Sequence, residues 1–119
     1  MKAARHVTSR SPRPTARERE DLVWKALANP HRRRILDLLR KRARTTGELA
    51  ESFDESRFAT MKHLRLLEDA KLVVVQRRGR ERWNLLNPAP IRSIYRRWIR
   101  PFEEESADWL LRIKDFVEE

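Results

Sequence analysis

The chain has 119 residues, of which 39% are hydrophobic and 39% charged, and its formal net charge is +10. A chain of this length predicts one folded unit with tails. It contains no cysteine, which excludes disulfides, thiolate metal ligands, a cysteine nucleophile and thiol redox sensing. No apolar run approaches the roughly 20 residues that span a bilayer, so we expect a cytoplasmic protein without a membrane partner, although an Arg- and Ser-rich start is also typical of organellar transit peptides.

The basic charge is concentrated in the middle of the sequence. Residues 22–100 carry twenty bases and eight acids, a charge of +12, whereas residues 101–119 carry two bases and seven acids, a charge of −5. A basic body of this kind favours a polyanionic partner, most simply nucleic acid. The alternative is that the charge only keeps the protein soluble.

The first segments are a tail and two helices. Residues 1–15 contain no acid, two prolines and no hydrophobic period, a composition typical of a disordered basic tail. Residues 16–28 have apolar side chains at helical spacing and predict a first helix. Asn29 is a favoured N-cap and Pro30 is tolerated in a first turn, so a second helix is expected to begin here and run to about Arg42.

Two further helices are predicted in close succession. Thr45 and Glu48 have the spacing of a capping box and open a short helix. Asp54 or Ser56 then caps the next helix. The expected inner side of this helix comprises Ala59, His63, Leu64, Leu67 and Ala70.

From Leu72 the pattern changes from helical to extended. Residues 72–86 are rich in Val, and residues 82–85 alternate polar and apolar side chains. Gly79 lies between two arginine-flanked arms. The pattern predicts a two-stranded hairpin with a basic tip.

The C-terminal part predicts two helices with an unpaired apolar stripe. A short helix follows the break at residues 87–90, and Pro101 permits a fresh helical start. Glu103 to Glu105 then lie in the first turn, where the helix dipole favours acids. A chain this short has little core to bury large aromatic residues this late, so a dimer interface is favoured over plain core packing. The predicted interface residues are Leu22, Trp98, Phe102, Trp109, Leu110, Ile113 and Phe116.

The order of these elements predicts a mainly α fold with a small two-stranded β-wing. Four residues join the two central helices, a length suited to a helix-turn-helix, and the hairpin supplies the wing of a winged helix-turn-helix. We therefore divide the chain into a disordered basic tail at 1–15, a winged helix-turn-helix DNA-binding domain at 16–100 and a C-terminal dimerisation helix at 101–119.

The charges of the second central helix are reversed relative to its dipole. Arg57 and Lys62 come early and Glu68 comes late, whereas a helix favours acids at its start and bases at its end, by about 0.3–1 kcal/mol per charge. In a helix-turn-helix the N-terminal residues of the second helix lie at base edges in the major groove. Bound DNA would offset the unfavourable arrangement.

Four segments resemble, in order and spacing, the ArsR family of bacterial winged-helix repressors. They are VWKALANPHRRRILDLL (23–39), GELAESF (47–53), SRFATMKHLRLLEDAKLV (56–73) and RRGRERWNLL (77–86). The resemblance covers about residues 20–100 and implies a homodimer that binds a palindromic operator in double-stranded DNA and is nucleoid-associated when bound.

The resemblance also implies which residues contact DNA. The recognition-helix positions are Ser56, Arg57, Thr60, Met61, Lys62 and His63, and the wing positions are Arg77, Arg78, Arg80 and Arg82. Thr46 and Arg65 complete the predicted DNA-binding set. For His63, a packed core histidine competes evenly with a phosphate contact.

Three departures from the family pattern matter. Many members sense metals through cysteines before the turn or through Asp and His pairs on the C-terminal helix, and this chain has neither arrangement. Its three histidines, His6, His31 and His63, are scattered and lack flanking acids, so we expect no metal site. Lys71 stands where the family usually has glycine, which predicts a different helix end. Phe58 and Met61 are bulkier than usual, so the operator cannot be inferred from relatives.

The remaining function classes are weaker. No Ser-His-Asp set, phosphate loop or paired-carboxylate arrangement is present, so we expect neither an enzyme nor a cofactor. A winged-helix protein-interaction or dimerisation module, working through the acidic C-terminal helix, remains the alternative to a sequence-specific repressor. RNA binding is disfavoured, because only Phe58 is an aromatic residue expected to face outward among the bases. The sequence identifies no effector.

Overall fold

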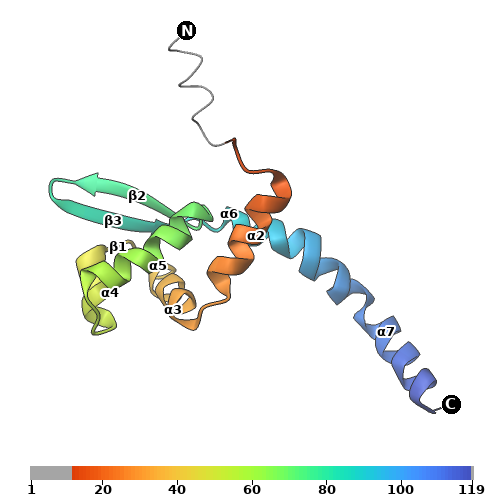
Figure 1. Cartoon of the computed structure of the whole chain (residues 1–119). Helices are drawn as coiled ribbons and strands as arrows, with labels where there is room; N and C mark the ends of the chain where they lie inside the picture. The colour runs from red at the N-terminus through yellow and green to blue at the C-terminus, as the bar shows by residue number, and fades with distance from the viewer. Residues whose placement is uncertain (1–11, 119) are drawn as a thin grey trace, which may run out of the picture.

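The computed structural model describes residues 12–118 and shows a helical body from which a hairpin and a C-terminal helix project (Figure 1). Most of the predicted disordered tail, residues 1–11, lies outside the described residues. The elements in chain order are α2 (Ala16–Leu27), α3 (Pro30–Leu39), β1 (Arg44–Thr45), α4 (Thr46–Ser52), α5 (Arg57–Asp69), β2 (Val73–Arg78), β3 (Glu81–Leu86), α6 (Ala89–Ile94), the π-helical turn η1 (Tyr95–Ile99) and α7 (Arg100–Glu118).

Side-chain caps fix the starts of the first helices, as the sequence predicts. Asn29 Oδ1 accepts the backbone N–H groups of His31 and Arg32 at 2.8 and 3.1 Å. Thr45 and Glu48 form a capping box at the start of α4, with reciprocal bonds of 2.9 and 3.1 Å. Hydrogen bonds from Arg42 and from the Thr45 backbone lower the pKa of Glu48 to about 2. These caps satisfy backbone donors that a helix N-terminus leaves unpaired.

The predicted two-stranded wing is confirmed as β2 and β3, and a third strand that was not predicted, β1, joins its sheet. Its order is β1-β3-β2, antiparallel throughout, and β1 pairs Arg44 with Asn84. Because the chain must extend here to reach β3, α3 ends at Leu39, short of the predicted Arg42. Among residues 82–85, where polar and apolar side chains alternate, the buried residue is Asn84. Its Nδ2 donates to the Arg44 carbonyl and to Thr46 Oγ1, both at 3.2 Å.

Each helix of the helix-turn-helix is followed by a residue in the left-handed region. After α4, Asp54 has φ of 51°, and the Glu55 N–H donates to the Ala50 carbonyl at 2.9 Å. After α5, Lys71 has φ of 64°, and the Leu72 N–H donates to the Leu67 carbonyl at 2.9 Å. These are Schellman ends, which usually contain glycine. The expectation that Lys71 changes the geometry of this helix end is therefore wrong.

The core lies between α2, α3, α4, α5 and the base of the wing. Helix α5 contributes Leu64 and Leu67, which are fully buried. The prediction of its inner side was right for these residues and for Ala70, but Thr60 is fully buried whereas Ala59 and His63 are only partly so. The cluster consists of Val23, Ala26, Ile35, Leu36, Leu39, Leu49, Leu64, Leu67, Ala70, Leu72, Val73 and Ile94.

The C-terminal helices form one continuous segment, which corrects the predicted fresh start at Pro101. The Arg100 N–H donates to the Tyr95 carbonyl, five residues back. Such a wide turn accommodates a proline, whose ring would clash with the carbonyl four residues earlier in a regular helix. The proposed boundary at residues 100 and 101 falls inside this segment. Helix α7 projects away from the body (Figure 1), and none of its residues is buried. No helix among residues 12–118 has the length and apolarity that a bilayer requires.

Candidate nucleic-acid interface

Helices α4 and α5 form the helix-turn-helix, and the turn between them is tightly specified. After the Schellman end at Asp54, Ser56 caps α5 by accepting the Ala59 N–H at 3.1 Å. Ser56, predicted as a DNA contact, is exposed, but its hydroxyl already serves this cap. Because Leu64 and Leu67 fix which side of α5 faces the core, the opposite side faces solvent. That side carries Arg57, Phe58, Lys62 and Arg65.

Phe58 is exposed beside the predicted contacts, although the predicted DNA-binding set omits it. Its side chain is 71% exposed, and the Lys62 ammonium lies 4.7 Å from its ring centroid. The spacing of four residues puts these side chains on one helix face. An aromatic ring next to a lysine on an exposed helix face is suited to contact DNA. The four-residue spacing of Phe58 and Lys62 was the signal in the sequence that could have identified Phe58.

Three predicted contacts lie beneath this surface. Thr60 is fully buried, and its hydroxyl donates to Glu55 Oε1 at 3.1 Å. Thr46 is nearly buried and accepts a hydrogen bond from Asn84, and Met61 packs partly against the core. Thr60 therefore cannot reach a base edge in this conformation, and we leave it out of the direct contacts proposed below. Thr46 and Met61 also line the cleft between α5 and the wing, and for them a DNA contact stays a prediction.

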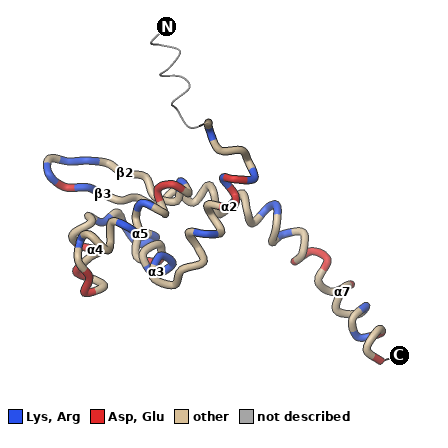
Figure 2. Tube along the Cα trace, viewed as in Figure 1, with Lys and Arg blue, Asp and Glu red and all other residues tan. Residues whose placement is uncertain are grey.

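The wing presents three exposed arginines near its tip (Figure 2). Arg77 and Arg78 lie at the end of β2 and Arg80 in the two-residue turn. That turn begins at Gly79 with φ of 60°, the left-handed conformation that hairpin turns of type II′ require at their first central residue.

Arg82 has a different role from the other wing arginines. Its side chain is 14% exposed, and its Nη2 lies 3.4 Å from Glu68 Oε1 on α5. This ion pair ties the wing to the recognition helix. It also gives Glu68, the acid near the end of α5, a basic partner within the chain. The sequence did not reveal this pairing.

A cleft of about 280 Å³ separates the start of α5 from the wing. Arg57 borders it on the helix side, and Arg77, Arg80 and Arg82 border it on the wing side. The Arg57 guanidinium lies over Gly47, where an added Cβ would be 3.0 Å from Nη2. The fold thus gathers four arginines around one groove whose lining includes a single acid, Glu81.

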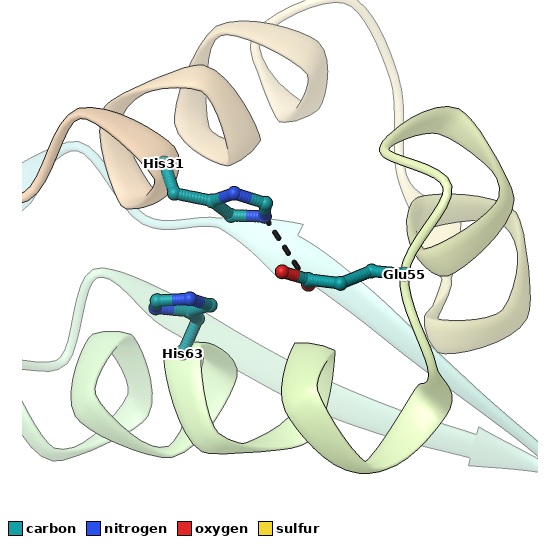
Figure 3. A group of neighbouring side chains, drawn as sticks. All are labelled: His31, Glu55 and His63. Atoms are coloured by element: carbon teal, nitrogen blue, oxygen red, sulfur yellow. Dashed lines mark ion pairs between the residues drawn. The ribbon is translucent and has the colours of Figure 1, made fainter.

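His63 lies on the flank of α5 and is packed against other side chains. Its ring stacks on His31 with centroids 4.6 Å apart and an interplanar angle of 14°. Burial is the main cause that lowers the pKa of His63, and the charge of His31 adds to it. The expectation that the histidines are scattered is wrong for this pair, because His31, Glu55 and His63 gather at one place (Figure 3). His6 lies outside the described residues.

A helix-turn-helix with a basic exposed recognition face beside a basic hairpin defines a winged helix-turn-helix DNA-binding protein. Residues 27–76 match the family model described as a helix-turn-helix domain. The chain is 32% identical over 89 residues to the transcriptional repressor SdpR of Bacillus subtilis, covering 75% of this chain and 86% of the relative. It is 38% identical over 87 residues to the HTH-type transcriptional regulator YuzN of the same organism, covering 67% and 95%.

Solved structures agree with these relatives. A possible transcriptional regulator for arsenical resistance superposes with a TM-score of 0.58 at 36% identity, covering 71% of this chain and 92% of that one. The ArsR-like transcriptional regulator from Rhodococcus sp. RHA1 superposes with a TM-score of 0.61 at 27% identity, covering 84% and 91%. The chain belongs to the ArsR family of winged helix-turn-helix regulators, and it is a DNA-binding transcription regulator.

Proposed function

We propose that this regulator is a homodimeric repressor that binds a palindromic operator. The observation that carries the proposal is the groove in which Arg57 of the recognition helix faces the arginines of the wing. A duplex that places its major groove on α5 brings an adjacent phosphate strand to the wing. The relative SdpR is named a repressor, which supports the direction of regulation.

The exposed residues divide into readout and positioning roles. Arg57 lies in the first turn of α5, where a guanidinium suits guanine O6 and N7, and Phe58 next to it suits a thymine methyl group. Lys62 and Arg65 follow on the same face and are proposed to contact phosphates, as are Arg77, Arg78 and Arg80 on the wing. Arg82 and His63 are proposed to hold the recognition helix in place.

The second copy is inferred from the unpaired stripe of α7. Trp109, Ile113 and Phe116 are 51%, 56% and 79% exposed, and large apolar side chains gathered on one helix face indicate a protein interface. A homodimeric winged helix-turn-helix domain from Mycobacterium bovis has the same fold at 22% identity and a TM-score of 0.60. In that protein, the fold assembles in pairs.

The other predicted interface residues lie in η1, in α7 and in α2. Trp98 and Phe102 stack with centroids 6.5 Å apart, and the Trp98 indole N–H donates to Glu20 of α2. Leu22 is half-buried against the core of its own chain, so we give it a peripheral place in the interface. Leu110 is 66% exposed and belongs to the stripe.

A twofold dimer would repeat each contact one helical turn of DNA away, ~10 bp, or a multiple of that distance, which requires a palindromic site.

The proposed place of action is the cytoplasm, on the nucleoid, and we assign the protein no catalytic activity. The acidic, apolar α7 also supports a protein-interaction module as a second candidate.

Footprinting on the DNA upstream of the protein's own gene separates the two functions. The repressor predicts one protected palindrome and an affinity whose logarithm falls linearly with the logarithm of salt concentration. An interaction module predicts no protected site, with equal, weak binding to scrambled duplex.

A further inference from the structure

His31, Glu55 and His63 come from three different elements and converge on one point (Figure 3). His31 lies in the first turn of α3, Glu55 in the connection before α5, and His63 in the middle of α5. One ligand atom from each lies within 4.8 Å of the others. We propose that these three side chains bind a divalent transition-metal ion of the zinc class.

The donor set suits such an ion. Two imidazoles and one carboxylate, without a thiolate, form a three-ligand site that leaves a fourth position for water. Donors around tetrahedral zinc lie about 3.4 Å apart, given bonds of about 2.1 Å. His31 Nε2 and Glu55 Oε1 are already 3.3 Å apart, and since all three ligand atoms lie within 4.8 Å of one another, none has to approach another by more than about 1.4 Å.

His31 Nε2 is the atom that most directly points to a missing partner. It is buried and has no hydrogen-bond partner among the described residues, because its approach to Glu55 lacks hydrogen-bond alignment. Buried polar atoms are normally paired. A metal ion bridging the imidazole and the carboxylate would satisfy both groups.

Neighbouring groups hold the ligands in place. Thr60 donates its hydroxyl to Glu55 Oε1 at 3.1 Å and so orients the carboxylate from within the core, as outer partners of metal ligands do. His63 is held by the stacking of its ring on His31, with the two ring centroids 4.6 Å apart.

Arg32 places a positive charge beside His63. Its Nη1 lies 3.4 Å from His63 Nδ1, a long contact, whereas its Nε and Nη2 donate to the carbonyls of Ala26 and Lys25 at 2.9 Å. The guanidinium is therefore held mainly by the end of α2, and it makes only a weak hydrogen bond to the Nδ1 lone pair of His63. The carboxylate of Glu55 offsets the positive charge of Arg32.

A metal here would connect α3 and the turn directly to the recognition helix. An ion that binds only the folded chain raises its stability by mass action. The site thus gives the cell a way to set the rigidity of the helix-turn-helix without a cysteine.

The test uses the full chain after dialysis against a chelator. Zn²⁺ is titrated in competition with a chromophoric chelator, Co²⁺ is followed by visible absorption, and thermal unfolding is recorded with and without Zn²⁺. We expect one Zn²⁺ per chain, a rise in Tm and the intense visible bands of tetrahedral Co²⁺.

His31→Gln, Glu55→Gln and His63→Gln should each lower the Zn²⁺ affinity by more than about tenfold, the minimum loss that even an outer partner causes. Glu51→Gln, outside the cluster, should leave it unchanged. Absence of stoichiometric Zn²⁺ binding by the wild-type chain overturns the proposal, whatever the variants do. So does wild-type affinity in His31→Gln or His63→Gln, or its loss in Glu51→Gln. No readout involves DNA, so failure here leaves the proposed repressor function intact.

Discussion

Helices α5 and α7 are both amphipathic, but each lacks a different kind of partner. In α5 the apolar stripe is satisfied by the chain itself, since Leu64 and Leu67 are fully buried. Its charges oppose the helix dipole, with Arg57 in the first turn and Asp69 in the last. Helix α7 continues the helical segment from η1 without a new N-terminus, and no residue of its apolar stripe is buried.

The difference shows which partner each helix needs. Helix α5 has exposed basic side chains in its N-terminal half, and its apolar side is already buried. It therefore lacks an anionic partner, which a long polyanion such as DNA supplies. A helix with an exposed stripe of large apolar side chains lacks a second apolar surface. Substitutions on α5 should therefore be detected in DNA binding, and substitutions on α7 first in the oligomeric state of the protein.

The largest expected effect comes from charging the α7 stripe. Trp109→Glu combined with Ile113→Glu should convert the dimer to a monomer and lower operator affinity by about 100-fold or more, because two linked half-site contacts become one. Sedimentation and operator titration measure the two effects. Asp115→Lys, on the opposite side of α7, is the matched control and should remain dimeric. A double variant that is still a dimer would show that α7 is not the interface.

The next largest effect is expected at the start of α5. Arg57→Ala should cost roughly 1–3 kcal/mol on the operator and relax base preference at one position in each half-site. Titration against the operator and a scrambled duplex measures both. Equal weakening on the two duplexes would remove Arg57 from readout, and Phe58 would then be the remaining candidate in the first turn.

A substitution on the wing should give the opposite pattern. Arg80→Ala should weaken binding to operator and scrambled DNA alike, and it should reduce the salt slope by about one unit for each phosphate that the variant no longer neutralises. Measurements at two or more salt concentrations give the slope. Weakening confined to the operator would show that the wing reads sequence.

The smallest expected effect concerns the end of α5. Lys71→Gly should raise the free energy of unfolding by about 1 kcal/mol, because glycine adopts the left-handed conformation at φ of 64° without steric cost. Chemical denaturation measures it, with Lys71→Ala as the control that keeps a Cβ. Operator affinity should be unchanged by either substitution. A decrease of stability in Lys71→Gly would mean that the lysine side chain itself holds the helix end.

Features that depend on local chemistry were predictable from the sequence. The caps at Asn29, Thr45 and Ser56 are side chain to backbone bonds within three residues, so residue spacing is sufficient to identify them. The exposed side of α5 follows from the period of its apolar residues. The wing is indicated by Gly79 between two arginine-flanked arms, of which the first is rich in Val.

Features that depend on distant contacts were not predictable. Strand β1 has two residues and no period, and it exists because Arg44 pairs with Asn84. Thr60 and Glu55 bond in the interior of the turn, although both are ordinary polar positions in the sequence. His31 and His63 lie on different helices yet stack ring on ring, and only the packing of α3 against α5 brings them together.

The central claim is that α5 requires DNA and α7 requires a second copy in the same complex. Sedimentation of the wild-type chain on a duplex carrying the footprinted site tests both requirements at once. The account predicts two chains per duplex, and dissociation of the complex as salt is raised. One chain per duplex, or a complex indifferent to salt, would contradict it.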